Sequence, residues 1–269
     1  MILGAFFILT FVLTWTAWFA AAALAGPNNS GFFGIRGPVF LLGVLVPALV
    51  AVALTVRVEG RDAAGKLLAR IGRWQVDARW YLFAVGYFPI TQLAVAVIHR
   101  VVTGVWPPLA DVRWPLIVGA ILVSTWVQAG EELGWRGYAL PRLADHIGLG
   151  GASILLGVAW ALWHLPLFYL PGTGSEGQSF LVYLLHVTAL SVAMAWLYWK
   201  TEGSLLLVML MHASVNNTGF VPAAVNGATR ELAFGGSLVG WLIVGVSWLV
   251  AAPLLIQMRG RRLADRLAP

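Results

Sequence analysis

Eight long apolar runs constrain the fold of this sequence more than any other feature. A helix that crosses a membrane needs about 20 predominantly apolar residues, because each residue adds about 1.5 Å of rise. Charged residues make up 10% of the 269 positions, whereas about 25% is usual in a soluble domain. The pattern predicts an all-α fold, a polytopic membrane protein with a bundle of about eight transmembrane helices. The expected spans are 2–25, 38–56, 80–101, 115–137, 150–170, 180–199, 203–220 and 236–257.

The basic residues predict how these spans are oriented. If both termini are cytoplasmic, 13 of the 17 Lys and Arg fall on the inner side, as the positive-inside rule requires. We therefore predict an integral protein of the cell (plasma) membrane with both termini in the cytoplasm. The basic residues lie in loops rather than in a soluble basic domain, so no nucleic-acid partner is expected. The inner segment 57–79 is typical of a short amphipathic helix on the membrane surface.

No internal repeat or low-complexity tract divides the chain. Residues 1–269 are therefore expected to form a single integral membrane domain. Cysteine is absent, which excludes disulfides, cysteine nucleophiles and thiolate metal sites.

The fourth expected span contains charged residues where lipid should be. Glu131 and Glu132 are adjacent, and Arg136 follows Glu132 at i, i+4, on the same helix face. One charged side chain at a helix centre costs roughly 2.5–3.5 kcal/mol on insertion scales. Gly130 and Gly134 form a small-xxx-small pair that would let a neighbouring helix approach closely. The competing interpretation is a helix end at which Glu and Arg reach water.

Two other spans also carry polar residues near mid-depth. The fifth contains His164, and the seventh contains His212 and Asn216 at i, i+4 on one face. Packing explains one buried histidine more easily than a polar group spread over three helices, and intramembrane ionisable residues are functional candidates by default. His186 lacks a polar neighbour at helical spacing and is interpreted as structural, and His146 as a loop residue.

These residue types suggest hydrolysis by an activated water. Glu131 would act as the general base towards a water held jointly with His164. His212 and Asn216 could donate hydrogen bonds to the oxyanion, at about 3–4 kcal/mol for one such donor. Alternatively, Glu131, His164 and His212 could bind zinc and leave the fourth position open. No His-Glu-x-x-His is present, so the metal-free interpretation is favoured, with no cofactor assigned and zinc as the alternative.

The three polar segments resemble a known family. Glu131–Arg136 matches the pattern Glu-Glu-x-x-x-Arg, and His212–Asn216 matches His-x-x-x-Asn. Trp160–His164 matches Phe-x-x-x-His except that Trp160 replaces the usual Phe. Three such motifs in order, within about residues 115–220, are similar to the core of the CAAX proteases and bacteriocin-processing enzymes, which include the type II CAAX prenyl endopeptidases.

The resemblance implies an intramembrane endopeptidase that cleaves a peptide or membrane-protein substrate within the lipid bilayer. It assigns water activation to Glu131 and His164, oxyanion stabilisation to His212 and Asn216, and support of the site to Glu132 and Arg136. Family members have been described as metalloproteases, and a metal-free glutamate mechanism also fits. The alternative functions are a non-catalytic immunity or adaptor protein, or a small proton-coupled transporter that uses the same polar cluster.

Overall fold

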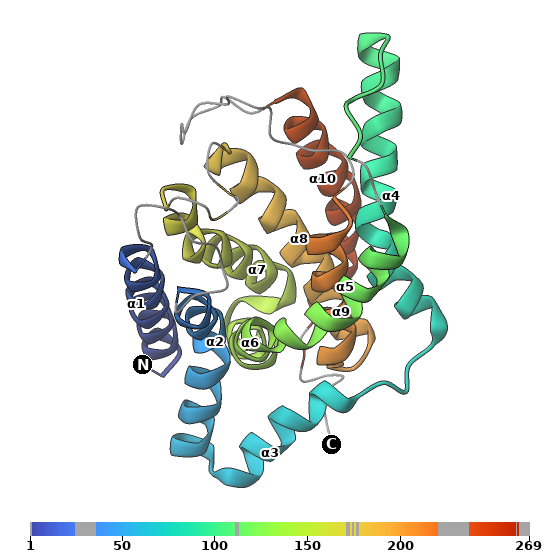
Figure 1. Ribbon diagram of the computed structural model, residues 1–269. Coiled ribbons are helices and arrows are strands. Elements are labelled where there is room, and N and C mark those ends of the chain that lie inside the picture. The colour runs from blue at the N-terminus through green and yellow to red at the C-terminus, as the bar shows by residue number, and fades with distance from the viewer. Residues whose placement is uncertain are drawn as a thin grey trace.

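A computed structural model describes residues 2–24, 36–110, 113–170, 173, 175, 178–219, 237–261 and 263. The described residues form helices and connecting turns, without a strand (Figure 1). The bundle consists of α1 (Ile2–Ala23), α2 (Arg36–Glu59), α4 (Ala78–Thr103), α5 (Trp114–Val127), α6 (Ala129–Glu132), α7 (Leu140–Trp163), α8 (Phe180–Lys200), α9 (Leu205–Asn217) and α10 (Leu238–Met258). Shorter elements are α3 (Arg61–Ala69), η1 (Arg70–Gly72), the π-helical η2 (Leu133–Ala139) and η3 (Leu165–Phe168).

The long helices are those of an integral membrane protein. Among the described residues, six helical stretches are long and apolar enough to cross a membrane, and α9 is a shorter apolar helix. One stretch, Trp114–Trp163, has 50 residues and would be about 75 Å long if straight, so it contains two passes. This arrangement confirms the predicted all-α bundle of about eight helices.

The boundary between those two passes lies near the predicted position, but the connection is a helix with a sharp break rather than a loop. Gly148 has φ 73° and ψ 161°, which breaks the helix close to the expected start at residue 150. The stretch 138–147, predicted to be a loop, is helical, so the interpretation of His146 as a loop residue was wrong. Leu140, Leu143 and Ala144 are buried, and their burial stabilises a helix in the stretch expected to connect two spans.

Two helices with an internal proline, α2 and α4, each receive a hydrogen bond from a hydroxyl of a neighbouring helix. A proline cannot donate to the carbonyl four residues earlier, and lipid offers that carbonyl no partner. In α2, Pro47 leaves the Gly43 carbonyl without its usual backbone donor, and the hydroxyl of Thr14 in α1 donates to this carbonyl at 3.0 Å. In α4, Pro89 leaves the Val85 carbonyl without its backbone donor, and the hydroxyl of Ser214 in α9 donates to it at 2.9 Å.

Close contact between α2 and α6 confirms the predicted role of the small-residue pair. A Cβ atom added at Gly130 would lie 2.9 Å from the Val44 carbonyl oxygen, and one at Gly134 would lie 2.6 Å from Pro47. Neither distance is compatible with a side chain. The two glycines therefore let α2 pack directly on the segment that carries the glutamate pair.

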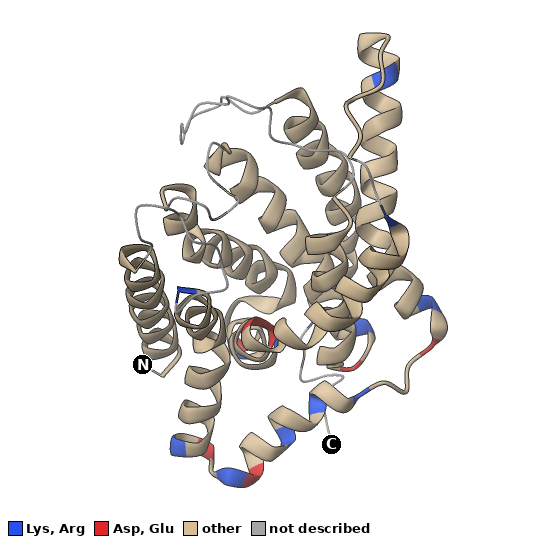
Figure 2. Ribbon diagram, viewed as in Figure 1, with Lys and Arg blue, Asp and Glu red and all other residues tan. Residues whose placement is uncertain are grey.

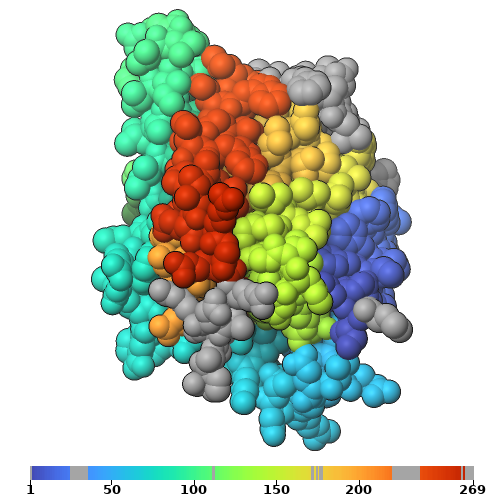
Figure 3. Space-filling view, turned by 180° about the vertical axis from the view of Figure 1, so that it is seen from behind, coloured from blue at the N-terminus to red at the C-terminus, as the bar shows by residue number. Residues whose placement is uncertain are grey.

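The helix predicted within 57–79 is present in the central part of that segment, where α3 and η1 run across one end of the bundle (Figure 1). Leu67 of α3 faces Gly137 of η2, and Arg70 donates to the Tyr198 hydroxyl at 2.7 Å. Figure 2 shows most of the drawn Lys and Arg at this end and few at the other. On the far face, α10 lies beside α4 and against α8 (Figure 3).

We expect Ser214→Ala to lower the free energy of unfolding by about 1 kcal/mol, because the Val85 carbonyl would lose its donor inside the membrane. SDS titration of the protein in mixed micelles would measure the change. Thr16→Ala is the matched control, because the exposed Thr16 hydroxyl donates to the Val12 carbonyl of its own helix. Equal stability of the two variants would contradict the proposed role of Ser214.

Candidate active site

The centre of the polar cluster is an ion pair between Glu132 and Arg136. Nη1 of Arg136 lies 2.9 Å from each carboxylate oxygen of Glu132, and both side chains are fully buried. The predicted i, i+4 pairing is therefore confirmed. The π-helical η2 carries Arg136, and such turns are frequent at functional sites. The pair is too deeply buried for a helix end that merely reaches water.

Glu132 also binds the histidine of the third motif. Nδ1 of His212 lies 2.8 Å from Oε1 of Glu132, and His212 is 3% exposed. A carboxylate paired with arginine can only accept hydrogen bonds, so the hydrogen bond assigns the proton to Nδ1 of His212. This contact joins α9 to α6 across 80 positions of sequence.

Glu131 points to a different partner, as the helical angle between adjacent residues predicts. Nε1 of Trp160 donates to Oε2 of Glu131 at 2.7 Å. Within the described part of the chain, no hydrogen bond to Oε1 of Glu131 is observed. Glu131 is 5% exposed, whereas Glu132 is completely buried. The two adjacent carboxylates therefore have different surroundings, and only Glu131 keeps an oxygen available for a further ligand.

His164 lies directly after α7 and is half-buried. Its Nδ1 lies 2.9 Å from the Trp160 carbonyl oxygen, which can only accept, so Nδ1 carries the proton. In the neutral ring, Nε2 is then an acceptor. Glu131 and His212 are both close enough to His164 for electrostatic interaction. The structure thus brings Glu131, Glu132, Arg136, His164 and His212 into one cluster.

Asn216 is the one predicted site residue that the structure does not join to this cluster. It lies one turn after His212 on α9, its side chain is exposed, and it makes no hydrogen bond with another described residue. The neighbouring Asn217 instead donates to the Ser124 hydroxyl at 2.8 Å, which links α9 to α5.

Aromatic side chains that were not predicted as site residues surround the cluster. The Trp160 ring lies under the Arg136 guanidinium, 4.3 Å from its Cζ, and 5.0 Å from the His212 ring. Trp163 and Tyr183 pack against His164, with ring distances of 4.7 and 5.6 Å. Trp160 precedes His164 by four residues, and this spacing was the sequence signal for its place on the same face.

The predicted zinc alternative is not supported by the arrangement of donors. Within the described ranges, no group of three His, Asp or Glu side chains is placed to hold one metal ion. As placed, these side chains do not form a three-ligand zinc site, although the bond from Nδ1 of His212 to Glu132 leaves Nε2 available for a ligand.

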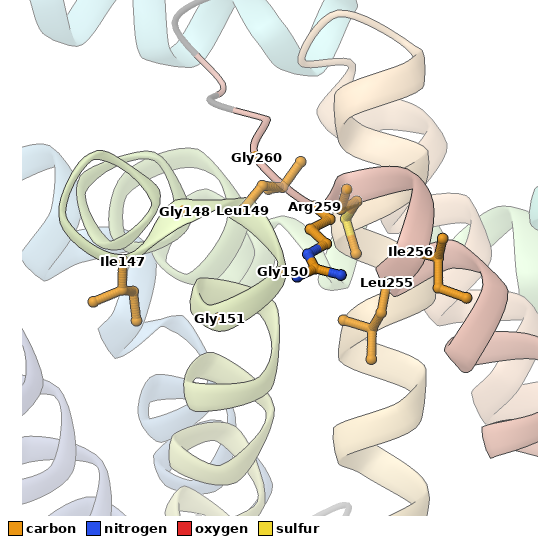
Figure 4. Close-up of a pocket in the computed structure, with 10 residues that line it drawn as sticks. Ile147, Gly148, Leu149, Gly150, Gly151, Leu255, Ile256, Arg259 and Gly260 are labelled. Atoms are coloured by element: carbon orange, nitrogen blue, oxygen red, sulfur yellow. The ribbon is translucent and has the colours of Figure 1, made fainter.

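A separate pocket lies where the Gly148 break faces the end of α10 (Figure 4). It has a volume of about 370 Å³ and is lined mainly by apolar side chains and glycines, with Arg259 the one charged lining residue. None of the motif residues lines it. The pocket is therefore not part of the candidate active site.

Comparison with known proteins agrees with the geometry. Residues 113–218 match the family described as Type II CAAX prenyl endopeptidase Rce1-like, and this range contains all three motifs. The chain is also 24% identical over 228 residues to CAAX prenyl protease 2 of Methanococcus maripaludis, which covers 78% of this chain and 81% of that protein. The fold defines a polytopic membrane protein, and the matches are to membrane proteases. Residues 113–218 are thus similar to the type II CAAX prenyl endopeptidases, which confirms the predicted resemblance.

We expect Arg136→Met to lower the free energy of unfolding by about 3–5 kcal/mol, because Glu132 would keep a buried charge without its main partner. Arg79→Met is the control, since the Arg79–Asp77 pair is about two-thirds exposed and should contribute less than about 1 kcal/mol. SDS titration in mixed micelles would measure both. Similar effects of the two substitutions would show that the buried pair has no special role.

Proposed function

We propose that the protein is an intramembrane endopeptidase in which Glu131 and His164 activate a water molecule. One observation carries this proposal. Glu131 keeps Oε1 without a described donor, and His164 keeps Nε2 as an acceptor, within the same buried cluster. A water can donate one hydrogen bond to each of these atoms. Its oxygen lone pairs then remain available to attack a carbonyl carbon.

In the proposed reaction, Glu131 takes one proton from the water as its oxygen bonds to the scissile carbonyl carbon. The carbonyl π electrons move to oxygen and form an oxyanion. The C–N bond then breaks, and Glu131 returns the proton to the leaving amine. The products are a carboxylic acid and an amine, so the atoms of the peptide and the water balance.

His212 and Asn216 would stabilise the oxyanion as the substrate binds. Because Nδ1 of His212 donates to Glu132, Nε2 donates only when the ring is protonated. The Glu132–Arg136 pair would support the site by holding the His212 ring in position. Asn216 lies one turn further along α9, and its exposed amide can turn towards a bound substrate.

We infer that the substrate is a peptide or membrane protein reached from the bilayer. The name of the Methanococcus maripaludis relative, CAAX prenyl protease 2, is consistent with a prenylated substrate of the CAAX type. The gathering of basic residues at the α3 end supports an orientation with that end, and both termini, on the cytoplasmic side of the plasma membrane.

We expect Glu131→Gln to reduce cleavage by about a hundredfold or more, because an amide cannot take up the proton of the water. The assay would use the protein in nanodiscs with a prenylated peptide, together with a comparison of membrane peptides from cells expressing the parent or the variant. Glu202→Gln, at an exposed position after α8, is the control. Unchanged cleavage by Glu131→Gln would exclude proteolysis through this site. A proton flux in sealed vesicles that depends on Glu131, without cleavage, would favour the transporter alternative.

We further expect that removal of divalent metals leaves cleavage within about twofold of the untreated protein, because the donor arrangement does not fit a three-ligand site. Dialysis against a chelator, followed by metal analysis and the same peptide assay, would test this. Loss of activity that stoichiometric zinc restores would contradict the metal-free mechanism.

A further inference from the structure

Trp160 contacts every member of the buried cluster except Glu132. Its Nε1 donates to Glu131, its ring lies against Arg136 and His212, and its carbonyl oxygen accepts from His164. The side chain is 2% exposed. One residue thus contacts both groups that are proposed to hold the water.

The hydrogen bond from Trp160 is not a general consequence of burying tryptophan here. Trp135 and Trp163 are completely buried beside the same cluster, yet their indole Nε1 atoms have no hydrogen-bond partner among the described residues. Burial of an indole N–H without an acceptor is unfavourable. Of these three neighbouring tryptophans, only Trp160 directs its N–H to a carboxylate.

The contact fixes the orientation of the Glu131 carboxylate. A carboxylate held at one oxygen by a rigid, buried donor presents its other oxygen in a defined direction, as second-layer partners do for other reactive groups. The same residue orients His164, because its carbonyl oxygen binds Nδ1 and leaves Nε2 as the acceptor. A phenylalanine could keep the ring contacts but not the N–H bond to Glu131.

We propose that Trp160 is a positioning residue that orients Glu131 and His164 towards one shared water. The indole N–H holds Oε2 of Glu131. Oε1 of Glu131 and Nε2 of His164 can then accept hydrogen bonds from the same water. The inference rests on the proposed hydrolytic function, because it concerns the geometry of that reaction. The family pattern has Phe at the position of Trp160, so the inference gives this difference a chemical role in this chain.

The decisive variant is Trp160→Phe, which removes the N–H and retains an aromatic ring. Trp163→Phe is the matched control, because it makes the same change on the same helix at an equally buried indole without a partner. We expect Trp160→Phe to lower kcat about tenfold with KM within about twofold, since one hydrogen bond to a charged group is lost. Trp163→Phe should change neither constant by more than about twofold.

A second measurement tests the contact without requiring activity. Thermal unfolding would be compared for both variants, in the parent and in a Glu131→Ala background, as a double-mutant cycle. We expect Trp160→Phe to lower Tm more than Trp163→Phe, and this difference to vanish when Glu131 is absent. Equal kcat and equal Tm for the two Phe variants would overturn the inference. If Glu131→Gln cleaves normally, the proposed function fails, whereas a cleavage-dead Glu131→Gln with a fully active Trp160→Phe overturns only the role of Trp160.

Discussion

The buried carboxylate of Glu132 is the feature on which the rest of the site depends. A charge inside a membrane protein is tolerated only when its partners are also buried and well placed. Arg136 provides the opposite charge from one helical turn away, and His212 provides a hydrogen bond from a distant helix. Satisfying this one group fixes how α6 and α9 approach each other, and so fixes where the second and third motifs can meet the first.

The adjacent glutamates divide two tasks that one carboxylate could not perform. Glu132 is fully buried and bonded at both oxygens, so it has no capacity for a substrate or water. Glu131 lies about 100° around the helix from Glu132, and among the described residues it is held at one oxygen only. The helical angle between neighbouring residues therefore separates a fully bonded carboxylate from the one proposed to be reactive.

Much of this arrangement followed from the sequence, and the remainder depended on contacts between helices. The expected span 203–220 is the 13-residue helix α9, which is too short to cross a membrane alone. The positions of the longer spans, the Glu132–Arg136 pair and the close approach at Gly130 and Gly134 follow from local periodicity and residue size. The π-helical form of η2 and the helical stretch 138–147 did not, because burial against other segments decides both. His186 illustrates the same limit, since its partner Ser247 lies 61 residues away on α10, at 3.1 Å.

The roles within the cluster required the three-dimensional structure for the same reason. Sequence spacing placed His212 and Asn216 on one face, but it did not show that His212 would bind Glu132 while Asn216 stays exposed. The bond from Trp160 to Glu131 also joins residues 29 positions apart, on helices whose packing no local pattern specifies.

The short helix α9 shows how such a site can be held rigid in a bilayer. At 13 residues it is about 20 Å long and too short to cross the membrane alone. Three side chains attach it to three different partners: His212 to α6, Ser214 to the carbonyl that Pro89 leaves free in α4, and Asn217 to α5. Lipid cannot compete for these polar contacts, so each favours one position of the helix. The histidine and asparagine motif thus lies on a helix fixed on three sides, which is the rigid support that the proposed water-activating site would require.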